Sequence, residues 1–128
     1  MQSLIPYVLV FIGGGIGSGL RLGVTRLAFH LTGAGFPLGT LTVNVVGSFV
    51  MGALAGLFAM KAVPEPLRML LMTGILGGFT TFSAFSLDFA TLYERGELGL
   101  AALYLVASVA LSVGALFAGL VLMRHVTA

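Results

Sequence analysis

Four apolar runs, each long enough to cross a lipid bilayer, occupy most of this 128-residue sequence. A helix needs about 20 apolar residues to span the hydrocarbon core of a membrane. The runs cover about residues 4–30, 38–60, 67–93 and 98–122, and short connections join them. Hydrophobic residues make up 59% of the chain and charged residues 8%, which is too little polar surface for a soluble domain. The sequence therefore predicts one all-α membrane domain over residues 1–128, with four transmembrane helices.

The composition excludes several kinds of site. The chain has no cysteine, so it has neither disulfides nor thiolate metal sites. His30 and His125 stand near the ends of apolar runs, where an interfacial position is more typical than metal binding. The net charge of +2 is small and scattered, so nucleic-acid binding is not indicated. Since no extramembrane module fits between the spans, we do not expect an enzyme.

Basic residues are divided equally between the two sides of the predicted bundle. With four spans, both termini lie on one side of the membrane. That side carries Lys61, Arg68 and Arg124, and the other side carries Arg21, Arg26 and Arg95. The positive-inside rule orients a protein through an imbalance of these residues, and here it gives no preference. Either other targeting context fixes one orientation, or the chain inserts both ways and pairs as an antiparallel dimer.

Small residues recur at the spacing that brings membrane helices together. Such pairs let two backbones approach closely in lipid, within one subunit or between subunits. The pairs are Gly13/Gly17, Gly15/Gly19, Gly19/Gly23 and Gly52/Gly56. Four short helices do not easily enclose a pore, so we expect a homo-oligomer. The run GGGIGSG does not fit the register of a dinucleotide-binding fingerprint.

Polar side chains repeat at helical spacing inside two of the spans. The second span contains Thr40, Asn44 and Ser48, and the fourth contains Tyr104, Ser108 and Ser112. A spacing of four residues places each set on one helix face. One interpretation is that these groups bond neighbouring helices, at about 0.6 kcal/mol each. The other is that they line a narrow path of neutral hydrogen-bond donors, which suits an anion.

The third span contains a predicted break within the segment TGILGGFTTFSAFS, residues 73–86. The break is expected near residues 77–81. The helix is expected to be interrupted near Gly77 and Gly78, and the hydroxyls of Thr80 and Thr81 are suited to cap the following half-helix. Irregular backbone is tolerated at membrane depth where it is buried in protein or lines a polar cavity. Free carbonyls near Gly77 favour a hard monovalent cation such as Na⁺, and a simple kink is the alternative.

Aromatic and acidic side chains follow the break. Phe82, Phe85 and Phe89 lie along one side of the third span, with Ser83 beside them. An aromatic ring has a positive edge that can meet an anion, although core packing is the ordinary role of phenylalanine. Asp88 is the acid well inside a span, and we expect it to face water or to pair with a basic residue.

Two other classes of function are compatible with four short spans. A proton-coupled multidrug exporter of the small dual-topology kind needs an intramembrane carboxylate early in the chain, and the first two spans contain none. A non-transporting assembly protein accounts for the glycine pairs, but gives no reason for the two polar stripes together with a broken helix.

Four motifs occur in the order GGGIGSGLR, GTLTVN, TGILGGFTTFSAFS and ERG. Together they resemble the Fluc (CrcB) fluoride channels over nearly the whole chain. Members of that family are antiparallel, dual-topology homodimers with two anion pores and a central Na⁺. The resemblance implies a fluoride-selective channel of the cell (inner) membrane. Such a channel passively exports fluoride from the cytoplasm and lowers its toxicity.

The resemblance also implies roles for individual residues. By matching positions, the Na⁺ lies on backbone carbonyls of Gly77 and Thr80 from both subunits. Arg21 matches an arginine near the aqueous entrance, and snorkelling to the membrane interface is its alternative role. From the resemblance and the polar stripes together, the predicted pore lining is Thr40, Asn44, Phe82, Ser83, Phe85, Tyr104, Ser108 and Ser112.

Overall fold

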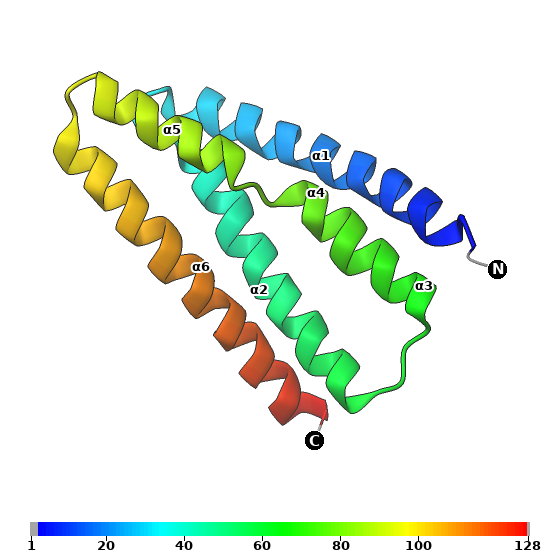
Figure 1. Ribbon diagram of the computed structural model, residues 1–128. Helices are drawn as coiled ribbons and strands as arrows, with labels where there is room; N and C mark the ends of the chain where they lie inside the picture. Colours follow the sequence, from blue (N-terminus) through cyan, green and yellow to red (C-terminus); the bar gives the residue numbers. More distant parts are fainter. Residues whose placement is uncertain (1–2, 128) are drawn as a thin grey trace.

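The computed structural model describes residues 3–127, whose regular structure is entirely helical (Figure 1). The elements are α1 (Ile5–Thr32), α2 (Leu38–Met60), α3 (Glu65–Arg68), the π-helix η1 (Met69–Leu76), α4 (Gly77–Phe79), α5 (Ser83–Glu94) and α6 (Leu98–Thr127). Stretches long and apolar enough to cross a membrane cover Ile5–Thr32, Leu38–Met60, Glu65–Glu94 and Leu98–Thr127. The prediction of four apolar spans, the third one bent, is confirmed.

Glycine and proline set the ends of several spans. Gly33 ends α1 with a φ of 78°, a left-handed conformation that suits glycine, and its N–H bonds the Phe29 carbonyl at 2.7 Å. Gly96 has a φ of 79° in the turn between α5 and α6. Pro37 directly precedes α2, and Pro64 precedes α3. Turns that contain glycine or proline therefore separate the spans.

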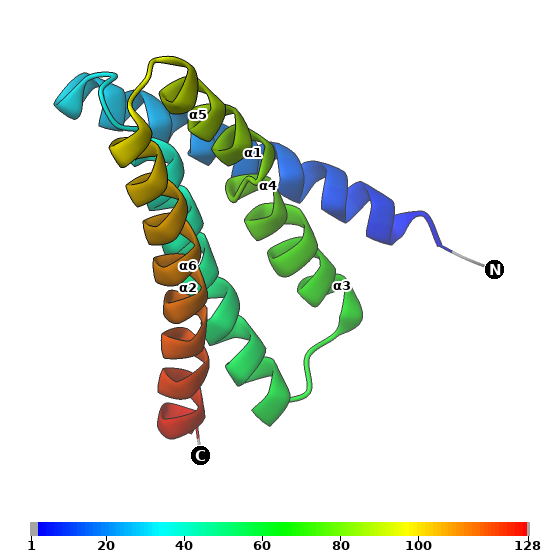
Figure 2. The same ribbon diagram turned by 60° about the vertical axis from the view of Figure 1, so that its left-hand side comes forward.

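The central helix of the arrangement is α2. On one side α2 packs against α6, and on its other side it contacts α1, which also packs against η1 and α4 (Figures 1 and 2). The α1–α2 and α5–α6 connections lie together at one end of the molecule. The outer ends of α1 and α6 lie away from these connections. This arrangement puts the bent span next to α2 and leaves α1 and α6 on opposite flanks.

Glycines form the closest helix contacts, as their spacing predicts. A Cβ built on Gly17 would lie 2.0 Å from the Ile75 carbonyl oxygen, and one on Gly52 would lie 1.9 Å from that of Leu116. Both pairs, Gly13/Gly17 and Gly52/Gly56, contact a neighbouring helix of the same chain. By contrast, a Cβ on Gly15, Gly19 or Gly23 meets nothing within 4 Å among the described residues. One face of α1 therefore packs inside the chain and another is left open.

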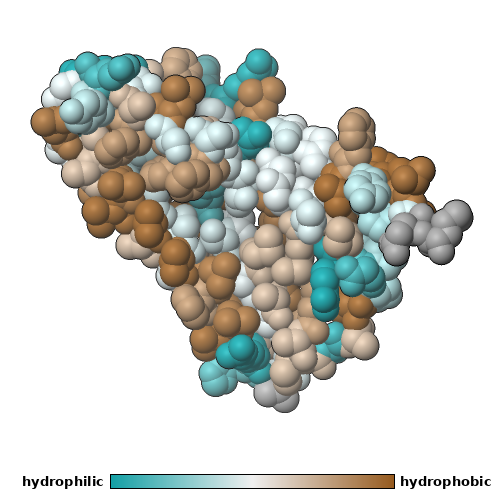
Figure 3. All heavy atoms as spheres, viewed as in Figure 1, coloured by the Kyte–Doolittle hydropathy of each residue, from teal (hydrophilic) through white to brown (hydrophobic). Residues whose placement is uncertain are grey.

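Much of the chain surface is apolar. The buried core is a small cluster of Phe85, Leu92, Ala101 and Tyr104. Hydrophobic residues cover the flank along α6, with hydrophilic residues near its two ends (Figure 3). Only 11–22% of each span's most apolar window is buried within the chain. Lipid or another protein chain must cover the remainder.

The break lies later than the glycine pair predicted to cause it. Gly77 and Gly78 are helical, and the irregular backbone begins at Thr80, with φ −85° and ψ 161°. A Cβ on Gly78 would lie 2.5 Å from the Gly14 carbonyl oxygen, so Gly78 allows α1 to approach. The helix thus opens within the predicted stretch 77–81, at the threonines rather than at the glycine pair, because Gly78 packs against α1.

Candidate functional site

Asn44 of α2 holds the broken helix through both ends of its carboxamide. Its Oδ1 accepts the backbone N–H of Thr81 at 2.8 Å, and its Nδ2 donates to the Thr81 carbonyl at 2.9 Å. Because only oxygen can accept the N–H, the pairing fixes which way the amide points. One remaining N–H of Nδ2 is left for another acceptor.

The two threonines at the break have different roles. Thr81 Oγ1 accepts the N–H of Ala84 at 3.1 Å, which caps the start of α5. Thr80 Oγ1 instead donates to the Leu76 carbonyl at 3.0 Å. The predicted capping by a threonine hydroxyl is confirmed for Thr81, and Thr80 stabilises the preceding half of the helix.

Arg21 of α1 also bonds the broken helix. Its Nε donates to the Gly78 carbonyl at 3.1 Å, and Ser18 Oγ lies 3.5 Å from the same oxygen. The side chain is partly buried and does not line the pocket described below. The guanidinium therefore satisfies a carbonyl at the end of α4, where the helix dipole is negative.

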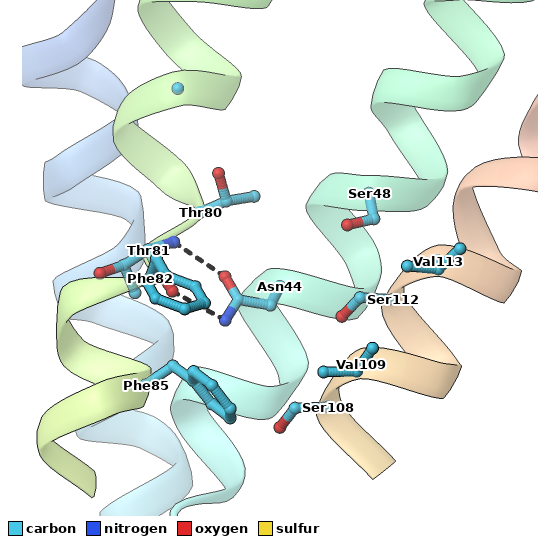
Figure 4. Close-up of a pocket in the computed structure, with 11 residues that line it drawn as sticks. Asn44, Ser48, Thr80, Thr81, Phe82, Phe85, Ser108, Val109, Ser112 and Val113 are labelled. Atoms are coloured by element: carbon cyan, nitrogen blue, oxygen red, sulfur yellow. Dashed lines mark hydrogen bonds between the residues drawn. The ribbon is translucent and has the colours of Figure 1, made fainter. Parts of the chain in front are cut away.

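An open pocket of about 410 Å³ lies between the break, α2 and α6 (Figure 4). Its lining includes seven residues predicted for the pore or the cation site: Asn44, Gly77, Thr80, Phe82, Phe85, Ser108 and Ser112. The other lining residues are Ser48, Thr81, Val109 and Val113. Within residues 3–127, the pocket lining contains no charged side chain. The pocket offers neutral donors, aromatic rings and aliphatic side chains.

Two hydroxyls in this pocket lack a hydrogen-bond partner. Ser108 Oγ and Ser112 Oγ are buried, and neither has a partner among residues 3–127. Both side chains point from α6 toward Asn44 and Phe85 (Figure 4). An unpaired buried hydroxyl costs about 1–3 kcal/mol. These serines therefore favour an occupant that accepts hydrogen bonds.

Aromatic rings continue from the pocket into the core. The Phe82 and Phe85 rings have centroids 5.5 Å apart at 49°, and Phe85 and Tyr104 lie 5.2 Å apart at 43°. Phe82 is 77% exposed, whereas Phe85 is 7% exposed. Phe82 is thus available to an occupant or a partner chain, and Phe85 is held by Tyr104.

Three residues of the predicted lining lie outside the pocket. Tyr104 is fully buried and donates its hydroxyl to Asp88 Oδ2 at 3.1 Å, so its O–H is already engaged. Thr40 is buried and lines a separate pocket of about 190 Å³ together with Asp88. Ser83 is exposed, and its Oγ lies 3.4 Å from Thr81 Oγ1. Asp88 was expected to face water or to pair with a basic residue. Within residues 3–127 it forms no ion pair, is partly exposed, and accepts the Tyr104 hydroxyl.

Some residues of the pocket carry no clear signal in the sequence. Val109 and Val113 each follow a serine of the α6 stripe, and a valine in an apolar span is typical of a lipid-facing position. Their place beside the stripe follows from the 100° turn per residue of a helix. The pairing of Asn44 with Thr81 joins residues 37 positions apart and has no local sequence signature.

Comparison with known proteins identifies the family. The family model described as "CrcB-like protein, Camphor Resistance (CrcB)" matches residues 8–120. The chain belongs to the CrcB family. The match includes every residue that lines the pocket.

Curated relatives of this CrcB chain are similar over nearly their full length. A protein of Nitrobacter hamburgensis named "Fluoride-specific ion channel FluC 2" is 56% identical over 122 residues, covering 94% of this chain and 98% of the relative. A "Fluoride-specific ion channel FluC" of Rhodopseudomonas palustris is 55% identical over 124 residues, covering 96% and 100%. One of Agrobacterium fabrum with the same name is 50% identical over 123 residues, covering 95% and 98%.

Proposed function

We propose that this protein is a fluoride-selective channel that lets fluoride leave the cytoplasm passively. The observation that carries the proposal is the pair of unpartnered buried hydroxyls, Ser108 and Ser112, in a pocket without charged side chains. The names of the relatives point to the same ion. In the inner membrane, such a channel uses the negative interior potential to expel the anion and so limits its toxicity.

The chemistry of the lining supports an anion as the occupant. Ser108 and Ser112 offer O–H donors, Asn44 keeps one N–H free, and the ring edge of Phe82 is positive. A carboxylate in the wall would repel an anion, and none is present among the described lining residues. Fluoride is a compact, strong hydrogen-bond acceptor, so closely spaced donors can replace its hydration shell.

An antiparallel homodimer is the second part of the proposal. The Gly15, Gly19 and Gly23 positions of α1 are open, and membrane helices associate through such small-residue faces. The pocket is open, so a second copy can complete its wall. The equal division of basic residues between the two membrane sides supports insertion in both orientations.

A structural Na⁺ at the centre of this dimer is the third part. The carbonyl oxygens of Gly77 and Thr80 accept no hydrogen bond within residues 3–127, and both residues line the pocket. Hard monovalent cations accept carbonyl oxygens in place of water. The donor set therefore fits the ion, with two oxygens from each copy. Bound Na⁺ supplies positive charge that holds the two bent helices together.

Ion efflux from liposomes tests the channel proposal. Vesicles containing the purified protein are loaded with fluoride or chloride, valinomycin is added, and ion-selective electrodes follow release. We expect rapid fluoride release and no chloride release above that of protein-free vesicles. Retention of both ions by the wild-type protein would overturn the proposal. Unchanged fluoride release from the Phe82→Ala variant would refute its place in the pore and leave the channel function standing.

A further inference from the structure

The backbone at the break leaves several carbonyls, among them those of Gly77 and Thr80, without their ordinary helical partners. In a continuous α-helix, the carbonyl of residue i accepts the N–H of residue i+4. The Gly77 carbonyl would accept the Thr81 N–H, and the Thr80 carbonyl would accept the Ala84 N–H. Neither bond is present among the described residues. These carbonyls are the two that the proposed Na⁺ uses.

Side-chain oxygens accept both of the N–H groups that these two carbonyls lack. The Thr81 N–H donates to Asn44 Oδ1 at 2.8 Å, and the Ala84 N–H donates to Thr81 Oγ1 at 3.1 Å. Each side-chain oxygen thus substitutes for one main-chain carbonyl. These two N–H groups therefore keep a partner, while the Gly77 and Thr80 carbonyls have none.

Three neighbouring carbonyls at the break are occupied, whereas that of Phe79 accepts no hydrogen bond among residues 3–127. The Leu76 carbonyl accepts both the N–H and the Oγ1 of Thr80, each at 3.0 Å. The Gly78 carbonyl accepts Arg21 Nε at 3.1 Å, and the Thr81 carbonyl accepts Asn44 Nδ2 at 2.9 Å. Donors therefore reach the carbonyls on either side of Gly77 but not that of Gly77 itself.

We infer that Asn44 and Thr81 are positioning residues for the cation site, because their side-chain oxygens withdraw the N–H groups that would otherwise occupy the Gly77 and Thr80 carbonyls. This inference rests on the Na⁺ of the proposed function. Asn44 also lines the pocket, and Phe82 directly follows Thr81. Asn44 therefore positions both the proposed cation site and the proposed anion path. Loss of its hydrogen bonds to Thr81 should disturb both.

Sodium-dependent stability of the purified protein tests this inference without measuring ion flow. Thermal unfolding is followed in detergent while NaCl replaces N-methylglucamine chloride at constant ionic strength. A ligand that binds the folded state raises Tm by mass action. We expect the Na⁺ concentration that gives half of the Tm increase to be about tenfold higher in Asn44→Ala. A tenfold change equals about 1.4 kcal/mol, similar to one or two hydrogen bonds.

Matched variants separate positioning from general damage. Ser112→Ala truncates another side chain of the same pocket without touching the break, so fluoride efflux should fall while the Na⁺ midpoint stays unchanged. Thr81→Val removes the hydroxyl that caps Ala84 and should raise the midpoint, whereas Thr81→Ser keeps the cap and should preserve the wild-type value. A Na⁺ midpoint that is the same in wild type, Asn44→Ala and Thr81→Val would overturn the inference.

The wild-type protein provides a second test should the variants fail to fold. Carbonyl ¹³C chemical shifts are compared in Na⁺ and in N-methylglucamine. Na⁺ should move the Gly77 signal and leave that of Gly78, which Arg21 already holds. Equal responses at both carbonyls would contradict the inference. Fluoride efflux with no Na⁺ effect on stability or shifts would refute the cation site alone, whereas Na⁺ effects without fluoride efflux would refute the channel alone.

Discussion

The contact between α2 and α6 at Gly52 predicts a large effect for a single added methyl group. A Cβ at this position would lie 1.9 Å from the Leu116 carbonyl oxygen, 2.8 Å from its carbonyl carbon and 3.0 Å from its Cα. All three atoms are backbone, so no side-chain rotation relieves the clash. Reaching an ordinary contact needs roughly 1.5 Å more separation between the helices.

That separation should reduce both stability and ion flow in Gly52→Ala. Overpacking of this kind costs about 1–3 kcal/mol. A displacement of this size is also comparable with the increase in donor–acceptor distance that breaks a hydrogen bond. Because Asn44 lies on α2 and the two pocket serines lie on α6, the donors would no longer converge on one occupant. We expect fluoride efflux to fall at least tenfold.

Gly114→Ala is the matched control for this experiment. Gly114 lies on α6, and a Cβ there would meet nothing within 4 Å among the described residues. Both variants gain the helix propensity of alanine, about 1 kcal/mol, so their difference reports the clash. The assays are thermal unfolding in detergent and efflux from liposomes, with a Tm at least about 4 °C below the control expected for Gly52→Ala. Wild-type Tm and efflux in Gly52→Ala would refute the reasoning.

Two further predictions concern the pocket and the break. Ser108→Ala should slow fluoride efflux about tenfold or more while leaving Tm at or above the wild-type value, because it removes a buried hydroxyl that has no partner in the chain; faster efflux would contradict this. Arg21→Ala should lower unfolding stability by about 1–3 kcal/mol, because it leaves the Gly78 carbonyl without its charged donor. Arg21→Gln, which keeps an N–H donor, should lose less in the same denaturation assay.

The parts of the fold that depend on local pattern were predictable from the sequence. The length of the apolar runs predicted the four spans. The spacing of small residues predicted the helix contacts of Gly17 and Gly52, because a helix repeats its faces at fixed intervals. The break was predicted within residues 77–81, and the helix opens at the threonine end of that stretch. Glycine is permissive of a bend without requiring one, and whether Gly78 bends depends on α1, which packs against it.

The sequence predicted most of the residues that line the site, but not the hydrogen bonds that these residues make. Helical periodicity placed Ser108 and Ser112 on one face, and the structure gives both to the pocket. No local pattern reveals that the Tyr104 hydroxyl is engaged by Asp88, or that Arg21 reaches the Gly78 carbonyl 57 positions away. Such partners are chosen by tertiary packing, which brings together groups that the chain keeps far apart.

The neutral wall of the pocket has an electrical consequence. One elementary charge crossing a potential of 100 mV gains or loses about 2.3 kcal/mol, which is how voltage sensors move. Among the described residues, the pocket wall carries no charged side chain. The Arg21 guanidinium lies outside the pocket, where it donates to the Gly78 carbonyl. In the proposed channel, the transmembrane field would therefore do work on a permeating ion and not on this wall. For the proposed channel we therefore expect a current that follows the driving force without a voltage-driven opening step, as in a fixed resistor.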